Sequence, residues 1–208
     1  MKTMFISSSF TSASPGSPAA RERVIEAAYS LFSRHGTHAV GVDAIVAAAR
    51  VAKMTLYRHF CSKDELILAY LACHEQQWSY RWLLDEVNRR TTDPAGRLLA
   101  VFDVLAKWFA RPDFTGCPFI TTMLERADPA HPVRKASVAH LATIRAFLRE
   151  LATAAQIADP AGFSHQWHLL MKGAIIAAEE GDTSAAYRAR ELGVLLLHRH
   201  GLSAHAVG

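Results

Sequence analysis

Residues 42–70 read VDAIVAAARVAKMTLYRHFCSKDELILAY, and no other stretch of the 208-residue chain carries as much structural information. Its first part, Val42 to Ala49, is rich in alanine and spaces its apolar residues as a short amphipathic helix does. After a three-residue break, helical spacing resumes from Lys53 to Phe60, with Leu56 and Phe60 four apart. Two short helices joined by a tight turn are typical of a helix-turn-helix, whose second helix enters the major groove of DNA.

The second helix keeps a polar face outward when Leu56 and Phe60 point inward. That face combines cations, a hydroxyl, a phenol and an imidazole, which are groups that contact phosphates or base edges. The residues expected to contact DNA are Lys53, Met54, Thr55, Tyr57, Arg58, His59 and Lys63. We expect the first three to face base edges, and Tyr57, His59 and Lys63 to hold phosphates. Arg58 is instead able to pair within the domain. Two packing helices of an unrelated all-α protein would fit the apolar spacing, but not this clustering of polar side chains.

The next helix begins with a capping signal. Ser62 is placed to cap it through its hydroxyl, and Glu65 is placed to reach back toward its start, as in a capping box. The free N–H groups at this helix start offer a seat for a phosphate, with Lys63 beside it.

Residues 51–71 resemble the DNA-binding signature of the TetR family of bacterial transcriptional regulators. The residues that carry the resemblance are Phe32 to Gly36, Ile45, Leu56 to Phe60, Ser62, Lys63 and Leu66. As a motif it covers roughly residues 20–71, and the remaining chain matches in length and helical character. The resemblance implies a homodimer that binds a palindromic double-stranded operator and responds to a small-molecule effector.

The chain departs from the family pattern at four positions. Arg50 stands where glycine is usual in the turn, so it must adopt a left-handed conformation or alter the turn. Gly41 and Ala52 stand where serine or threonine is usual, which removes two possible capping or phosphate-binding hydroxyls. Cys61 stands where proline is common. These differences affect the phosphate contacts and leave the motif intact.

The rest of the chain reads as helices, so we predict an all-α fold of about nine helices. A disordered tail is expected over residues 1–16, a three-helix DNA-binding domain over 17–62, and a larger effector-binding and dimerisation domain over 63–208. One long helix from Lys63 to about Arg90 would connect the two domains. Asp93-Pro94 and Asp159-Pro160 each combine a capping side chain with proline and mark two further helix starts.

Composition limits the class of protein. The net charge is +4, and residues 1–70 contribute +3 of it, which favours a DNA partner for that part. The three cysteines form no C-x-x-C pair, as expected for a reducing compartment. No apolar run is long enough to span a membrane, and the first ten residues lack a signal-peptide core. We therefore expect a cytoplasmic protein with no membrane partner.

Large apolar and aromatic residues are frequent after residue 72, on helices expected to pack together. Pockets for small ligands are lined mostly by such side chains. For each residue alone core packing is the better interpretation, and the set as a whole favours a pocket. The candidate effector-binding residues are Trp78, Trp82, Phe102, Phe119, Thr122, Met123, Trp167 and Met171.

The last two predicted helices, about 161–180 and 183–200, combine leucines with small residues that permit close helix approach. In the resembling family this helix pair forms a four-helix dimer interface. The candidate interface residues are Leu170, Ala174, Ile175, Ala178, Leu192, Leu195 and Leu196.

Other functions have less support in the sequence. There is no nucleophile elbow, P-loop, dinucleotide-binding turn or H-E-x-x-H motif, so we expect no enzyme and no cofactor. The eleven histidines lack Cys or carboxylate partners at ligand spacing, so we expect no metal site. A DNA-binding regulator controlled by oxidation of Cys117, or by a protein partner, is the main alternative to an effector-released repressor. An all-α enzyme is a remote one.

Overall fold

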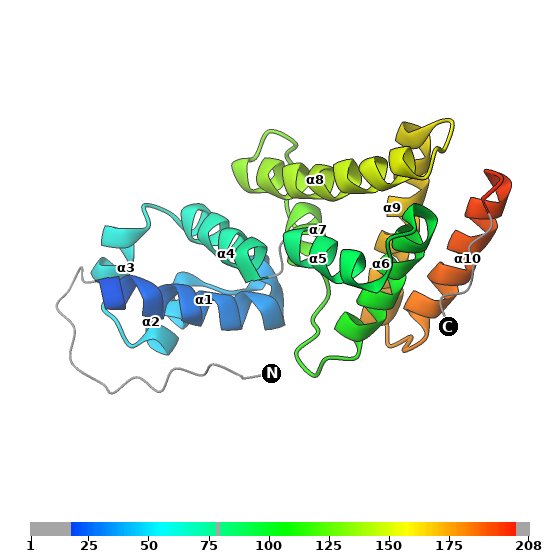
Figure 1. Ribbon diagram of the computed structural model, residues 1–208. Coiled ribbons are helices and arrows are strands. Elements are labelled where there is room, and N and C mark those ends of the chain that lie inside the picture. Colours follow the sequence, from blue (N-terminus) through cyan, green and yellow to red (C-terminus); the bar gives the residue numbers. More distant parts are fainter. Residues whose placement is uncertain (1–17, 78–79, 203–208) are drawn as a thin grey trace. The chain divides into compact units, whose positions relative to one another are not determined.

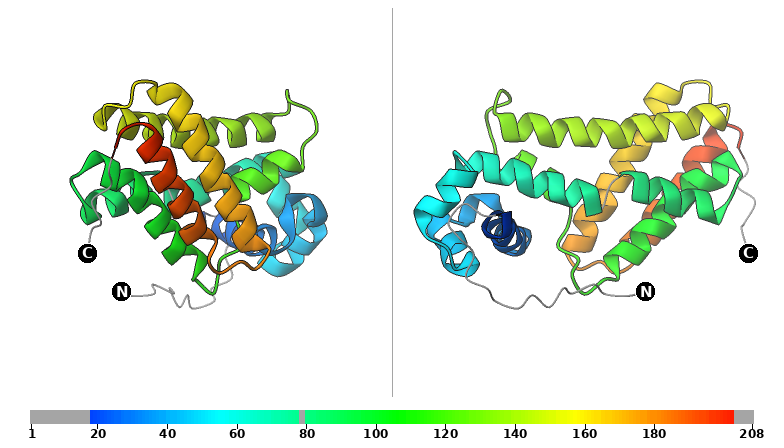
Figure 2. Two further views of the ribbon diagram at one scale, coloured as in Figure 1. Left: turned by 90° about the vertical axis from the view of Figure 1, so that its right-hand side faces the viewer. Right: turned by 60° about the vertical axis from the view of Figure 1, so that its left-hand side comes forward.

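The structure, a computed structural model, describes residues 18–77 and 80–202 (Figures 1 and 2). These residues form ten helices and no strand, which confirms the all-α fold. The helices are α1 (Pro18–Ala39), α2 (Val42–Ala49), α3 (Lys53–His59), α4 (Lys63–Gln77), α5 (Tyr80–Arg90), α6 (Pro94–Phe109), α7 (Pro118–Leu124), α8 (Pro132–Ala154), α9 (Pro160–Glu179) and α10 (Ala185–Arg199). The predicted tail over 1–16 and the candidate ligand residue Trp78 lie outside the described residues.

The chain divides into two compact units, and the division falls between Ile67 and Leu68, within α4. The sequence placed a domain boundary a few residues earlier, at the start of this helix. The helix count exceeds the expected nine because residues 63–90, predicted as one helix, contain α4 and α5 as separate elements. Residues 78–79, which join these two helices, are outside the described part of the chain.

In the first unit, α1, α2 and α3 pack on one another around a small apolar core. Its fully buried side chains are Val24, Ala28, Phe32, Ile45, Leu56, Phe60, Leu66 and Ile67. Gly36 has a φ of 77° and interrupts α1 near its end. The three helices of the predicted helix-turn-helix domain are therefore present.

The second unit is a helical bundle in which α8 packs on α7 and α9, and α10 packs on α6 and α9. Both predicted Asp-Pro starts are confirmed. The carboxylate of Asp93 accepts a hydrogen bond from Gly96 N at 2.7 Å, and that of Asp159 accepts one from Gly162 N at 2.9 Å. Each cap satisfies one of the free N–H groups at the start of a helix.

The core of this unit is centred on Trp167, which is fully buried and packs against Phe102 and Phe163 with ring centroids 5.2 Å apart in both pairs. Gly193 of α10 lies directly against it, because a Cβ added there would stand 2.9 Å from the indole ring of Trp167. The missing side chain lets α10 approach α9 closely, and the two helices run side by side in both views of Figure 2.

Candidate DNA-binding helix and ligand cavity

The turn between α2 and α3 is closed by Arg50 in the left-handed conformation, with φ 52° and ψ 50°. The N–H of Val51 donates to the carbonyl of Val46 at 3.3 Å, which is the hydrogen bond of a Schellman motif. Of the two conformations that the sequence left open for Arg50, the chain adopts the strained left-handed one. The helix-turn-helix thus forms without the usual glycine.

Helix α3 presents an exposed face that includes Lys53, Met54, Tyr57 and Arg58. Met54 is 67% exposed and Tyr57 40% exposed, so both side chains are accessible to a partner. The expectation that Thr55 faces outward is wrong, because Thr55 is only 6% exposed. The buried face of α3 includes Thr55 as well as Leu56 and Phe60, because Thr55 is next to Leu56 in sequence and lies on the same side of the helix.

Three further candidate DNA contacts, His59, Lys63 and Lys53, are either half-buried or bonded to another residue of the unit. His59 is half-buried, and its Nε2 is buried without a hydrogen bond. The ammonium of Lys63 donates to the carbonyl of His38 at 3.3 Å. Lys53 forms an ion pair of 2.8 Å with Asp43 of α2, and this contact raises the pKa of Lys53. Because the lysine and aspartate are both exposed, DNA phosphates can compete for the ammonium.

The start of α4 is capped largely as predicted. The hydroxyl of Ser62 accepts a hydrogen bond from Glu65 N at 3.1 Å. The Glu65 carboxylate reaches back and accepts from Cys61 N at 2.6 Å, one residue earlier than in the usual capping box. Arg23 of α1 donates to the carbonyl of Ala49 at 3.4 Å, which ties α1 to the end of α2. Helix α3 itself packs on α1 and α2.

The second unit contains an apolar cavity of about 680 Å³, measured with its opening to solvent. Its lining is mostly apolar, as is typical of small-molecule sites. Side chains from α4 to α9, together with the residue before α7, line it: His74, Trp82, Leu83, Leu105, Trp108, Cys117, Phe119, Ile120, His140, Leu141, Ile144, His168, Met171, Lys172 and Ile175.

Three of the eight candidate ligand residues line this cavity: Trp82, Phe119 and Met171. Phe102 and Trp167 pack against each other in the core and do not line it. Thr122 is fully buried and Met123 half-buried, and neither contributes to the cavity wall. A count of aromatic residues cannot separate core from cavity, because both use the same side chains.

The lining residues that the sequence analysis missed follow one face of each helix. On α9 they are spaced three and four apart, at His168, Met171, Lys172 and Ile175. On α8, His140 and Ile144 are four apart. Polar residues on an otherwise apolar helix face were the signal that would have identified this wall.

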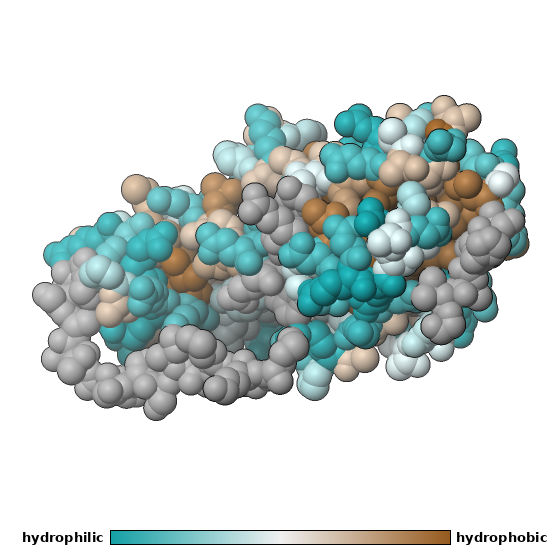
Figure 3. Space-filling view, in the orientation of Figure 1, coloured by the Kyte–Doolittle hydropathy of each residue, from teal (hydrophilic) through white to brown (hydrophobic). Residues whose placement is uncertain are grey.

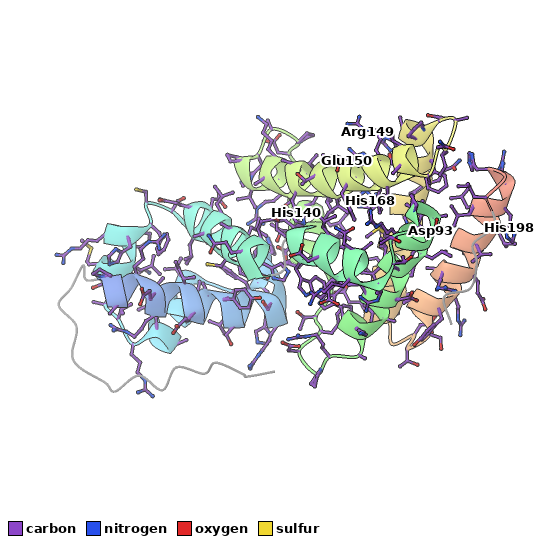
Figure 4. The ribbon with its side chains drawn as sticks, viewed as in Figure 1. Asp93, His140, Arg149, Glu150, His168 and His198 are labelled. Atoms are coloured by element: carbon purple, nitrogen blue, oxygen red, sulfur yellow. The ribbon has the colours of Figure 1, made fainter. Side chains whose placement is uncertain are left out.

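The cavity histidines are held near their neutral form (Figure 4 labels His140 and His168). Burial lowers the pKa of His74 to about 4, and the positive charge of His140 contributes. Burial also lowers the pKa of His168 to about 4, helped by cations that include Lys172 and Arg145. His140 contacts the carboxylate of Glu75 through Nδ1 and stacks on Phe119, with ring centroids 3.6 Å apart. Burial lowers its pKa despite the opposing effect of Glu75.

Cys117 precedes α7 and lines the same cavity. Burial raises the pKa of its thiol to about 11, and the nearby charge of Glu179 acts in the same direction. Because the thiolate is the form that reacts with oxidants, a thiol with this pKa reacts slowly at neutral pH.

The outer faces of α9 and α10 carry large exposed apolar side chains: Leu169, Ile176, Tyr187, Leu192 and Leu195. Figure 2 (left) shows α9 and α10 at the front, and in Figure 3 their side of the unit is seen from its edge, with apolar and hydrophilic surface mixed. Of the candidate interface residues, Leu192 and Leu195 are on this face.

The remaining candidate interface residues point inward or are half-buried. Ala174 and Ile175 are buried, and Ile175 lines the cavity. Ala178 is half-buried, and Leu170 and Leu196 pack against the core. Ala174 and Ile175 are therefore not available to an interface, because they are buried within the chain. For the other five residues the interface stays a prediction.

Neither a metal site nor a membrane segment is found among the residues that the structure describes. They contain no group of three or more His, Cys, Asp or Glu side chains placed to hold a metal ion. None of the described helices is long and apolar enough to cross a lipid bilayer.

Comparisons with known proteins match both units. Residues 24–70 match the family model of bacterial regulatory proteins of the tetR family, and residues 94–192 match that of the tetracyclin repressor-like C-terminal domain. The HTH-type transcriptional regulator YjdC of Escherichia coli is 24% identical over 178 residues, covering 82% of this chain and 91% of the relative. The HTH-type transcriptional activator FasR of Mycolicibacterium smegmatis is 40% identical over 86 residues, which cover 40% of this chain and 37% of the relative.

Solved structures give the same assignment over nearly the whole chain. A TetR-family transcriptional regulator of Streptomyces coelicolor is 30% identical, with a TM-score of 0.77, and the match covers 88% of this chain and 97% of that protein. A TetR-type regulator of Streptomyces avermitilis is 31% identical, with a TM-score of 0.76 and coverage of 88% and 98%. The chain belongs to the TetR family and is a DNA-binding transcriptional regulator with an N-terminal helix-turn-helix.

Proposed function

We propose that the protein is a homodimeric repressor that leaves a palindromic operator when a small-molecule effector occupies the cavity of its second unit. The observation that carries this proposal is the apolar cavity, which opens to solvent and is lined by side chains of six helices, α4 to α9. A chain that only bound DNA would have no need of such a cavity. The effector must bind better to the form of the dimer that fits the operator poorly, because equal affinity for both forms would release nothing.

The DNA-binding role is assigned to the exposed face of α3. Met54 and Lys53 are proposed to reach base edges, while Tyr57, Arg58 and Lys63 hold phosphates. Thr55 is left out of this set because it is buried. His59 has room for a contact only through the exposed part of its half-buried ring.

Dimerisation is assigned to the exposed apolar face of α9 and α10. Helix-turn-helix regulators read two half-sites about one DNA turn apart, so they need two copies in a fixed arrangement. An apolar face with Leu169, Ile176, Leu192 and Leu195 is suited to an isologous interface, because such a face loses its contact with water when a copy packs against it.

The test is binding of the purified protein to DNA upstream of its own gene, measured at two salt concentrations. Saturable binding that weakens with salt is expected, and Tyr57→Ala combined with Lys63→Ala should abolish it. Arg34→Ala, an exposed change on α1, is the matched control and should retain binding. Absence of binding both here and in a random-sequence selection would contradict the assignment.

Activation is the second candidate for the direction of control, because the relative FasR is described as an activator. A reporter gene under the bound promoter distinguishes the two. Deletion of the regulator raises reporter expression if the protein represses and lowers it if the protein activates.

A further inference from the structure

The polar side chains that line the cavity are neutral or positively charged, and none of those described is an acid. They are three imidazoles, one ammonium and one thiol: His74, His140, His168, Lys172 and Cys117. Among the described residues that form the wall, none is an aspartate or a glutamate. The wall therefore offers hydrogen-bond donors and positive charge, and the carboxylates in the neighbourhood lie behind it.

His168 is the polar group most in need of a partner. It is only 3% exposed, and its Nδ1 is buried without a hydrogen bond. A buried polar atom without a partner costs free energy in the empty site, and proteins rarely leave one so. Lys172 lies one helical turn further along α9 and lines the same cavity, so the two side chains converge on the same region.

The surroundings of His168 are cationic. Besides burial, the permanent cations Lys172 and Arg145 lower its pKa. Neither Lys172 nor Arg145 has an ion-pair partner in the described part of the chain. Of the nearby carboxylates, Glu75 contacts His140, and Glu179 lies where a side chain on Gly116 would be. Within residues 18–77 and 80–202, no acid therefore forms an ion pair with the cations at the His168 end.

The rest of the wall is apolar and partly aromatic. Trp82 and Trp108 line it beside aliphatic side chains such as Ile144 and Met171. Ring edges and aliphatic groups of this kind bind the hydrocarbon part of a ligand by excluding water. A molecule that matches both ends of the cavity has an apolar body and one anionic head.

We propose that the cavity binds a monoanionic organic acid, with its carboxylate between His168 and Lys172 and its aryl or alkyl body against Trp82, Trp108 and Met171. The carboxylate accepts hydrogen bonds from an imidazole N–H and from the ammonium, which are the charge-assisted kind. An amine of the same shape meets the ammonium of Lys172 and is repelled. The regulatory consequence rests on the function proposed above, whereas the binding itself does not.

The test uses the full-length protein and ligands that differ only in their head groups. One series is 4-phenylbutanoate, 4-phenylbutanamide and 4-phenylbutylamine, and the other is decanoate, decanamide and decylamine. Calorimetry gives the affinities, and quenching of tryptophan fluorescence reports occupancy, because Trp82 and Trp108 line the cavity. In at least one series the acid should bind about tenfold or more tightly than its amide, and the amine should bind weakest.

Variants test the assigned residues. Lys172→Met should weaken binding of the acid about tenfold and leave the amide within about twofold, because only the acid uses the charge. His168→Gln keeps a hydrogen-bond donor and should retain more affinity for the acid than His168→Leu does. Lys135→Met, which removes an exposed ammonium from α8, is the matched control and should change neither ligand.

The outcomes separate this inference from the proposed function. Equal binding of acid and amide in both series, no binding of any member, or an acid affinity unaffected by Lys172→Met would overturn the ligand class. If the acid binds through Lys172 but operator binding does not change, the ligand class is correct and the effector-release function fails. If only an uncharged compound both binds and releases DNA, the function is supported and the ligand class is wrong.

Discussion

The two units of this protein differ in where their candidate binding residues lie: on the surface in the first unit and around an internal cavity in the second. In the first unit most of the candidate DNA contacts are exposed side chains of one seven-residue helix, α3, and they take little part in the core. In the second unit the cavity wall is shared by helices α4 to α9, and several wall residues also pack the core. Substitutions on α3 should therefore change binding without changing stability, whereas substitutions around the cavity should change both.

The largest effect is expected from Trp167→Ala in the second unit. Trp167 is fully buried against Phe102, Phe163 and Gly193, so its removal leaves a large hole in a core that cannot collapse fully. The free energy of unfolding should fall by about 3–5 kcal/mol, measured by urea denaturation with circular dichroism. Tyr57→Ala, on the exposed face of α3, should change it by less than about 0.5 kcal/mol. Similar losses in the two variants would remove the contrast between the units.

Breaking the apolar face of α10 should have the next largest effect. Leu192→Asp combined with Leu195→Asp places two charges on the proposed dimer interface, where Leu195 is 64% exposed in the single chain. Sedimentation should show a monomer, and operator affinity should fall about a hundredfold, because one copy contacts only one half-site. Val138→Asp, an exposed apolar position on α8, is the control. A double variant that stays dimeric would move the interface elsewhere.

The same contrast explains which parts of the protein could be predicted from its sequence. The helix-turn-helix depends on local signals within about thirty residues: apolar spacing, the Ser62 cap and the cationic face of α3. Thr55 was misplaced because spacing of three and four defines the centre of a buried face and not its width.

The cavity depends on which helices meet, and a single sequence does not contain that information in local form. Trp82 and Trp167 are the same residue type, yet Trp82 lines the cavity and Trp167 fills the core. Helix α9 is apolar on both faces, so Ile175 was assigned to a dimer interface although it faces the cavity. Packing between distant segments decides both cases.

The third prediction concerns the change in stability with pH that results from protonation of His168 in the second unit. His168 has a folded-state pKa of about 4, below its ordinary value of 6.5, so the unfolded chain binds more protons between these values. Stability contributed by neutral His168 is therefore present above about pH 6.5 and is lost as pH falls toward 4. Between pH 7 and pH 5 this loss is about 2 kcal/mol, within a factor of two.

The measurement is the free energy of unfolding at several pH values for the ligand-free wild type and for His168→Gln. The groups that act on His168 are Lys172 and His165 on α9 and Arg145 and His140 on α8, and all are retained in the variant. Acid destabilisation should therefore be weaker in His168→Gln than in the wild type. Parallel pH profiles would mean that His168 is not buried in the neutral form.

The smallest effect on stability is expected at a backbone feature that both units contain, a non-glycine residue with positive φ at the end of a helix. Arg50 after α2 and Gln156 after α8 are the two non-glycine residues with positive φ in the described chain, at 52° and 58°. Each ends a helix in the same motif, since Val51 N donates to Val46 O and Ile157 N donates to Ala152 O. Glycine at either position removes the steric cost of the left-handed conformation and adds some entropy to the unfolded chain.

We expect Gln156→Gly to raise the free energy of unfolding by about 0.5 kcal/mol, because the steric relief exceeds the entropic cost. Arg50→Gly should gain less, since Arg50 takes part in a further interaction in the folded protein. Thermal and urea denaturation of both variants measure the difference. A loss of stability in both would contradict backbone strain at these helix ends. A loss in Arg50→Gly alone would mean that the arginine side chain, which replaces the usual glycine, stabilises the turn that positions α3.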